Sequence, residues 1–433
     1  MTQFSSDVLN PGVRRRELFG WAMYDFANSG YTTVVITAVF AAYFVGGVAQ
    51  GADWAPLAWT VALSISYAIV MLTMPSLGAW ADLRGAKKRL LMLFTAGCVL
   101  STAALAWVQP GGVALAMLLI VVSNTFYSYG ESLTAAFLPE LARTEALGKV
   151  SGWGWGFGYI GGMLTLGVCL AYVMSASARG EAAARFVPVT LLITAAIYGL
   201  AACVTFALLR ERATGVLAPG EGGGVLAALQ RLGTTFRAAR RYRDFIWLLA
   251  CTVAYQGGVA VAITLAAIYA EQVIGFVQQE TMTLIFVLNL AAAAGAFACG
   301  HLQDRIGHKL TLGLTLIGWI ATCVIAALAT TKGQFWWAAS IAGLCMGSSQ
   351  SAGRAMVGLL APAPRLAEFF GLWSFATRLA SIVGPLGYGL ITWATGGNQR
   401  VAIAATAMLF VLGLLALVPI DLRRGRDAAA QPT

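Results

Sequence analysis

Twelve apolar segments, each long enough to cross a lipid bilayer as a helix, divide this chain almost from end to end. A spanning helix needs about 20 predominantly apolar residues. The segments cover residues 20–47, 55–80, 89–108, 112–138, 151–174, 186–209, 244–272, 281–302, 309–330, 334–360, 367–395 and 400–420. Only 11% of the 433 residues are charged, whereas a soluble domain carries about 25%. We therefore predict an all-α membrane protein with twelve transmembrane helices.

The basic residues follow an alternation that tests this helix count. Lys and Arg beside membrane helices concentrate on the cytoplasmic side. If the N-terminus is inside, most of them fall in cytoplasmic segments: 14–16, 84–89, 143–149, 210–243, 305–309, 365 and 423–426. Both termini are thus predicted to be cytoplasmic. Topology also accounts for the net charge of +10 without a nucleic-acid partner.

Two loops repeat one pattern about half a chain apart. The first reads GAWADLRGAK and the second reads GHLQDRIGHK. Their shared positions are Gly78, Asp82 and Gly85 in the first loop and Gly300, Asp304 and Gly307 in the second. The repeat predicts two parallel six-helix halves, residues 1–209 and 244–433, joined by a cytoplasmic linker over 210–243. Parallel halves of six helices are a known plan of membrane transporters, which bind their solute at the interface of the halves, near the midplane.

These loops resemble the loop signature of the major facilitator superfamily, Gly-x-x-x-Asp-Arg-x-Gly-Arg-Lys, although the first copy has Leu83 and Ala86 at two of its basic positions. Three further stretches, GWAMYDFANS from Gly20, SGWGWGFGYIGG from Ser151 and EFFGLW from Glu368, resemble its vacuole-effluxer-like branch. That branch includes the fungal autophagy-related vacuolar amino-acid effluxer.

The resemblance implies a major facilitator fold of two pseudo-symmetric bundles, with the first, fourth, seventh and tenth helices around a central cavity. It implies amino-acid export as a function. It also implies that Asp82 and Asp304 bond to the N-terminal end of a neighbouring helix and lock the cytoplasmic side. The alternative is ordinary turn chemistry, since glycines such as Gly85 and Gly307 suit tight turns anyway.

Four ionisable residues stand out inside predicted membrane helices: Asp25, Glu131, Arg354 and Arg378. Such residues are costly in a bilayer and mark functional sites by default. Two of them end matched polar stripes with the spacing i, i+3, i+4, i+7, which places each stripe on one helical face. The stripes are Asn124, Tyr127, Ser128 and Glu131 in the fourth helix and Gly347, Gln350, Ser351 and Arg354 in the tenth.

Two hypotheses remain open for Glu131 and Arg354. In the first, Arg354, together with Arg378, binds a substrate carboxylate through its planar guanidinium, while Glu131 or Asp25 receives an ammonium group or a proton. In the second, Glu131 and Arg354 form a salt bridge between the halves, which acts as a gate on the cytoplasmic side.

Asp25 has an alternative structural role, because it lies about one turn into the first predicted helix, where a carboxylate is stabilised by the helix dipole. Asn28, one turn deeper, is the better cavity candidate. Tyr255, Gln256 and Asn289 are further candidates that could bond either a ligand or a neighbouring helix. Finally, Gly154, Gly158 and Gly162 form a small-x-x-x-small pattern that predicts close helix packing.

The chain has no H-E-x-x-H, G-x-S-x-G or Walker A pattern, and we expect no enzyme activity, cofactor or metal site. We predict a secondary transporter for a small polar or zwitterionic solute, with proton coupling as a hypothesis that rests on Asp25 and Glu131. The expected location is a bacterial inner membrane. An exporter of amphipathic compounds, or a lipid-handling membrane protein without solute flux, remains the alternative.

Overall fold

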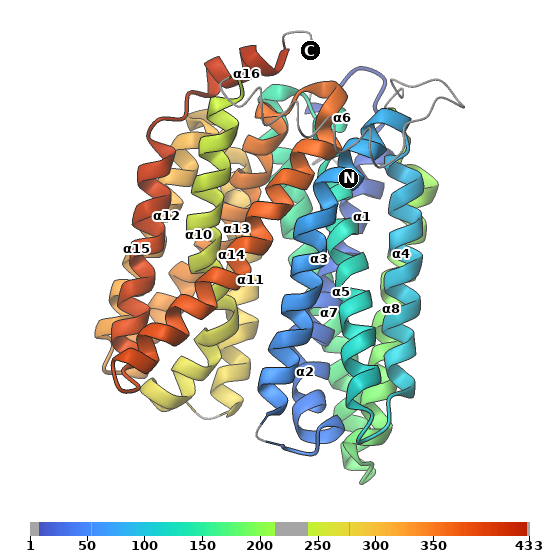
Figure 1. Cartoon of the computed structure of the whole chain (residues 1–433), viewed down its shortest axis with the longest axis vertical. Coiled ribbons are helices and arrows are strands. Elements are labelled where there is room, and N and C mark those ends of the chain that lie inside the picture. Colours follow the sequence, from blue (N-terminus) through green and yellow to red (C-terminus); the bar gives the residue numbers. More distant parts are fainter. Residues whose placement is uncertain (1–7, 53, 213–240, 277, 431–433) are drawn as a thin grey trace.

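The protein folds into a bundle of long, roughly parallel helices (Figure 1). The computed structural model describes residues 8–52, 54–212, 241–276 and 278–430, and no β-strand is assigned within these ranges. The long helices form two groups of six, as the sequence predicts. The start of α1 and the last helix, α16, lie at the same end of the bundle, which we call the termini end; the opposite end is the far end.

The first half contains six long helices and the short segments between them. These are α1 (Arg15–Tyr31), η2 (Thr32–Ala38), α2 (Phe40–Tyr43), η3 (Phe44–Val48), α3 (Ala55–Arg84), α4 (Lys87–Ala104), η4 (Leu105–Trp107), α5 (Val113–Ala135), α6 (Leu138–Leu141), η5 (Thr144–Ala146), α7 (Leu147–Ala178) and α8 (Ala183–Leu208). The first spanning segment runs from α1 through η3. Within this half, α1 packs on α7 and α8, and α5 packs on α3 and α4.

The second half repeats this plan. Its elements are α10 (Arg243–Tyr269), η6 (Ala270–Ile274), α11 (Gln278–Ile306), α12 (His308–Leu328), α13 (Lys332–Leu360), η7 (Ala363–Arg365), α14 (Leu366–Ala394), α15 (Gln399–Leu417) and α16 (Leu422–Ala430). Here α10 packs on α14 and α15, and α13 packs on α11 and α12. The predicted linker falls largely on residues 213–240, outside the described residues, so its boundaries stay a prediction.

Eleven helices of the described chain are long and apolar enough to cross a membrane. The twelfth spanning helix, α13, does not reach that apolarity because its middle carries Gly347, Gln350, Ser351 and Arg354. Most residues of this stretch are buried among neighbouring helices. A helix shielded in this way does not need an apolar surface, which explains why the polar stripe and a transmembrane position coexist.

Two helix pairs make the most extensive contacts between the halves, α3 against α14 and α7 against α11. We call these the first and second seam. The cross-half hydrogen bonds and ion pairs identified among the described residues all join the parts of the helices nearer the termini end. Toward the far end the ribbons of the two halves diverge (Figure 1). The structure is therefore closed at the termini end.

Glycine allows the second seam to close, since a Cβ on Gly152 would run into the Ala296 carbonyl oxygen of α11. A second row on α7, Gly154, Gly158 and Gly162, faces the first spanning segment, where an added Cβ would press on Asp25 and Ser29 of α1 and on Thr33 of η2. The predicted small-x-x-x-small packing of this row is thus confirmed. Helix α7 uses one glycine face within its half and another across the interface.

Candidate solute site between the halves

Asp25 and Arg354 form an ion pair that crosses from α1 to α13. The Arg354 Nη1 donates to Asp25 Oδ2 at 2.7 Å. Arg354 has further partners on α7: its Nε donates to Ser151 Oγ at 3.1 Å and its Nη2 to the Ser151 carbonyl oxygen at 2.8 Å. Its guanidinium also lies 4.8 Å from the Trp21 ring centroid and 5.3 Å from that of Trp155.

This pair is largely enclosed by the surrounding helices. The side chain of Arg354 is 3% exposed and that of Asp25 is 13% exposed. Gly154 makes room for the pair, because a Cβ there would come within 2.6 Å of the Arg354 guanidinium. A buried charge that is paired and hydrogen-bonded in this way becomes costly as soon as one partner is removed. The pair is therefore suited to hold the halves together at the termini end.

Glu131 and Arg378 form a second ion pair across the interface, from α5 to α14. It differs in exposure, since the Glu131 side chain is 31% exposed. The Tyr127 hydroxyl donates to the other carboxylate oxygen of Glu131 at 3.3 Å. The Tyr67 ring of α3 lies 5.4 Å from the Arg378 guanidinium carbon. The pair is thus walled by two tyrosines and is still partly open.

Arg378 uses few of its hydrogen-bond donors. Its Nη2 donates a hydrogen bond to Glu131, and its buried Nε has no partner among the described residues. A guanidinium carries five N–H donors, and an unpaired buried donor is unfavourable. Arg378 therefore retains a hydrogen-bond donor that none of the described residues uses.

The predicted pairing of Glu131 with Arg354 is wrong. Their two stripes do lie on interior faces, but each charge crosses to a different helix: Arg354 to Asp25 and Glu131 to Arg378. The alternative structural role of Asp25 is also wrong. Since α1 begins at Arg15, before the predicted start at residue 20, Asp25 lies about 15 Å along the helix and bonds the other half.

The other polar candidates of the first half are hydrogen-bonded within it. Asn28 accepts from the Tyr198 hydroxyl at 2.7 Å, and Asn124 donates to Ser66 Oγ at 2.5 Å. Both are buried. Tyr127 stacks on Tyr31, with ring centroids 5.0 Å apart. Of this set, Tyr127 is the one that the structure brings to an ion pair.

In the second half, Gln256 of α10 donates to Gln350 of α13 at 2.7 Å. Gln256 also lies 3.4 Å from the Tyr255 hydroxyl, and Tyr255 is fully buried. Asn289 donates to the Ile285 carbonyl of its own helix. These residues thus satisfy one another or the backbone, and the structure does not bring them to either ion pair.

The two repeated loops make the helix-end contacts that the resemblance implies. Asp82 accepts from the backbone N–H groups of Ala367 and Glu368, at 3.1 and 2.9 Å, where α14 begins. Asp304 accepts from those of Gly148 and Lys149, at 2.9 and 2.8 Å, where α7 begins. A carboxylate at a helix N-terminus meets free N–H groups and the positive end of the dipole. Each contact closes one seam.

The glycines of the two loops have separate tasks. Gly85 and Gly307 adopt positive φ values of +58° and +94° between consecutive helices, which glycine does without steric cost. Gly78 faces the Ala367 carbonyl oxygen across the first seam, and Gly300 lies against Gly152 across the second. One glycine of each loop thus forms a turn, and the other allows the helices of a seam to touch.

Sequence reasoning missed several residues of this interface. Ser151 and Tyr67 contact the two arginines, and Arg365 forms a buried bidentate pair with Glu368, at 2.8 and 2.5 Å. The spacing of Arg365 and Glu368, three apart at a helix start, was a usable signal. Nothing in the local sequence marks Ser151 or Tyr67 as partners of an arginine.

Two six-helix halves that meet through paired helix-end contacts define a transporter of the major facilitator superfamily. Among solved structures, the superfamily transporter FucP in the outward conformation matches with a TM-score of 0.72 at 15% identity, covering 94% of this chain and 98% of that chain. A bacterial homologue of the iron transporter ferroportin, in an outward-facing state, matches at 0.70 and 12% identity, over 94% and 99% of the two chains. At such identities the likeness concerns the fold.

Within this class, the chain belongs to the vacuole effluxer Atg22-like family, whose sequence model matches residues 58–430. The MFS-type transporter YxiO of Bacillus subtilis is 29% identical over 421 residues, which cover 95% of this chain and 96% of that protein. Autophagy-related protein 22-1 of Aspergillus niger is 26% identical over 328 residues. That match covers 70% of this chain and about half, 52%, of the fungal protein. The family and fold are those of transporters, not of enzymes.

Proposed function

We propose that this protein is a secondary active transporter that moves a small zwitterionic solute of the amino-acid type by alternating access. The observation that carries the proposal is the Glu131–Arg378 pair, which is partly exposed, undersatisfied and flanked by Tyr67 and Tyr127. A zwitterion presents a carboxylate to an arginine and an ammonium group to a glutamate. It can therefore replace the ion pair by two charge-assisted bonds of the same kind.

The Asp25–Arg354 pair has a different role in this proposal. It is enclosed and already bonded to Ser151, so it has no room for a solute. Together with the Asp82 and Asp304 contacts it holds the termini end shut. Opening that end requires all of these contacts to separate, which makes the pair a gate.

The charge distribution supports placing the termini end in the cytoplasm, because the basic loops collect there. In that orientation the described state is closed to the cytoplasm. The match to a Bacillus protein along nearly the full chain supports a bacterial inner membrane as the location. Proton coupling is assigned in this proposal to Glu131, the more exposed carboxylate of the two ion pairs.

The test is uptake of a mixed pool of labelled amino acids into proteoliposomes, with and without an inward-acid pH gradient, combined with equilibrium binding in detergent. Glu131→Gln and Arg378→Lys should weaken solute binding by roughly 10- to 100-fold, the cost of a lost charged hydrogen bond. Asp25→Asn and Arg354→Lys should keep solute binding within a few-fold and impair flux. The two pairs thus serve as controls for each other.

The outcomes separate the parts of the proposal. Gradient-driven flux that persists in Glu131→Gln would exclude this carboxylate from proton coupling. If wild type neither binds nor moves any amino acid, the solute class is wrong. The aromatic walls formed by Tyr31, Tyr67 and Tyr127 would then favour an amphipathic solute, to be tested by uptake of lipophilic cations.

A further inference from the structure

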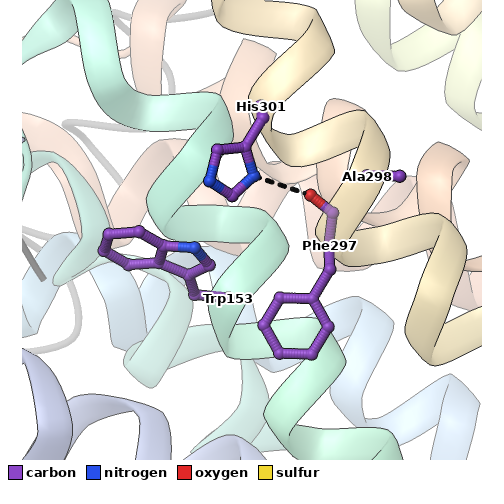
Figure 2. A pocket seen from close by; sticks show the side chains of 4 residues that line it. All are labelled: Trp153, Phe297, Ala298 and His301. Atoms are coloured by element: carbon purple, nitrogen blue, oxygen red, sulfur yellow. Dashed lines mark hydrogen bonds between the residues drawn. The ribbon is translucent and has the colours of Figure 1, made fainter. Parts of the chain in front are cut away.

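A cavity of about 330 Å³ lies beside the second seam, outside both ion pairs. It is lined by Trp153 of α7 and by Phe297, Ala298 and His301 of α11. Figure 2 shows Trp153 facing Phe297 and His301 across the cavity, with the imidazole bonded to the Phe297 carbonyl oxygen at 2.9 Å. The cavity is therefore built from both halves, and it exists in this form only while α7 and α11 are in contact.

The cavity lies on a surface that faces the bilayer. Ala298 and His301 are exposed, and Leu302 lies on the same side of α11 with 41% exposure. Apolar side chains this exposed on a transmembrane helix face hydrocarbon. The slot between Trp153 and Phe297 is thus open to lipid acyl chains, not to the space between the halves.

Two cations lie on the same two helices, nearer the termini end than the residues that line the cavity. Lys149 Nζ lies 5.1 Å from the Trp153 ring centroid. Its ammonium group forms no salt bridge within the part of the chain that the structure describes, although its charge acts on the nearby Asp304 carboxylate. Arg305 is exposed and lies two turns along α11 from Phe297, about 12 Å nearer the termini end. The nearby Asp304 carboxylate already accepts from two backbone N–H groups.

We infer that this cavity binds an anionic phospholipid. Its phosphate would lie between Lys149 and Arg305 at headgroup depth, with His301 beside it, and one acyl chain would fill the slot between Trp153 and Phe297. The order of the residues along both helices matches the order of groups in such a lipid, with charge at the helix ends and apolar surface one to two turns deeper. Basic pockets between membrane helices bind anionic headgroups by this combination.

A lipid bound here contacts both halves at once, Lys149 and Trp153 on one side and Phe297 and Arg305 on the other. Because the site is complete only while the second seam is closed, binding favours the closed termini end by differential affinity. The inference concerns a site away from the proposed solute pair, and it holds whatever the solute is.

The test is a lipid titration of the full chain in detergent, followed by native mass spectrometry. Phosphatidylglycerol is compared with phosphatidylcholine of the same acyl chains, and inorganic phosphate serves as a probe for the headgroup alone. Wild type should bind one phosphatidylglycerol roughly tenfold more tightly than phosphatidylcholine, because each basic residue contributes to the preference for anionic lipid.

Three variants decide the assignment. Lys149→Gln with Arg305→Gln should abolish the preference, while leaving the Lys149 backbone N–H bond to Asp304 intact. Ala298→Phe should fill the slot and weaken both lipids. Arg89→Gln, which removes an exposed cation at the same end on α4, should change neither. Equal binding of the two lipids by wild type would overturn the inference, and so would full binding by Ala298→Phe or effective competition by inorganic phosphate.

Discussion

The first and second seams close in the same way but differ in the side chains around the contact. In each, a carboxylate from one half accepts two consecutive backbone N–H groups at the start of a helix in the other half: Asp82 at α14 and Asp304 at α7. Glu368 and Lys149 therefore hold matching positions, since each supplies the second of these N–H groups. One is an acid and the other a base.

The surroundings of these two residues differ accordingly. Glu368 is fully buried and is bonded twice by Arg365, which also lies near the rings of Tyr242 and Phe369. Lys149 is half-buried, with its ammonium group over the ring of Trp153, which lines the cavity beside the second seam. The closing contact thus depends on a carboxylate and backbone N–H groups in both seams. The neighbouring charged residue differs: Glu368 is buried in the first seam, and Lys149 is partly exposed in the second.

The largest effect should come from breaking the buried charge pair at the first seam. Glu368→Gln leaves Arg365 without its anion and should lower stability by about 3–5 kcal/mol. At the matching position of the second seam, Lys149→Gln should change the free energy of unfolding by less than about 0.5 kcal/mol. The measurement is the midpoint of thermal unfolding in one detergent. Similar shifts for the two variants would mean that the seams are not as different as their side chains indicate.

A smaller effect should come from adding a methyl group at the close helix crossings. Gly78→Ala and Gly152→Ala place a Cβ against the carbonyl oxygens of Ala367 and Ala296, and should each disfavour the closed termini end by about 1–3 kcal/mol. The check is the rate at which maleimide labels a cysteine introduced as Ser132→Cys, with the native cysteines replaced. Ser132 is buried beside Phe370, so opening of the termini end should make the labelling faster. Gly387→Ala has no atom within 4 Å of its Cβ and should leave labelling unchanged.

The smallest effect should come from neutralising the two seam carboxylates. Asp82→Asn and Asp304→Asn each keep one acceptor oxygen and lose the charge at a helix N-terminus, a change of about 1 kcal/mol. Measured by the same labelling rate, the effects should be additive in the double variant. A deviation above about 0.5 kcal/mol would show that the seams are energetically coupled.

The fold could be predicted from the sequence because the signals for it are local. Apolar length predicts all twelve spanning helices, and the polar stripe ending at Arg354 makes α13 less apolar than the other eleven. The repeated Gly and Asp spacing leads to Asp82 and Asp304. Their contacts with a helix N-terminus were implied by the resemblance of both loops to the major facilitator signature, and the structure shows them.

The ion pairs could not be predicted, because they depend on how the helices cross. Periodicity places Glu131 and Arg354 on interior faces, but the partner of each is decided by rotation and by small residues nearby. Arg354 reaches Asp25 because Gly154 leaves space and Ser151 accepts and orients the guanidinium. Glu131 meets Arg378 instead. The position of Asp25 was misjudged because α1 extends beyond its apolar run into the polar residues from Arg15 onward.

The two glycine faces of α7 limit how this helix can drift in evolution. One face, with Gly148, Gly152 and Gly156, has no space toward α11, and the other, with Gly154, Gly158 and Gly162, has none toward α1. In a saturation mutagenesis screen, the glycine positions of both faces should accept no larger residue. Only lipid-facing positions such as Ile160 should vary freely. Adaptation of this transporter to a new solute is thus expected to proceed through α5 and α14, and hardly at all through α7.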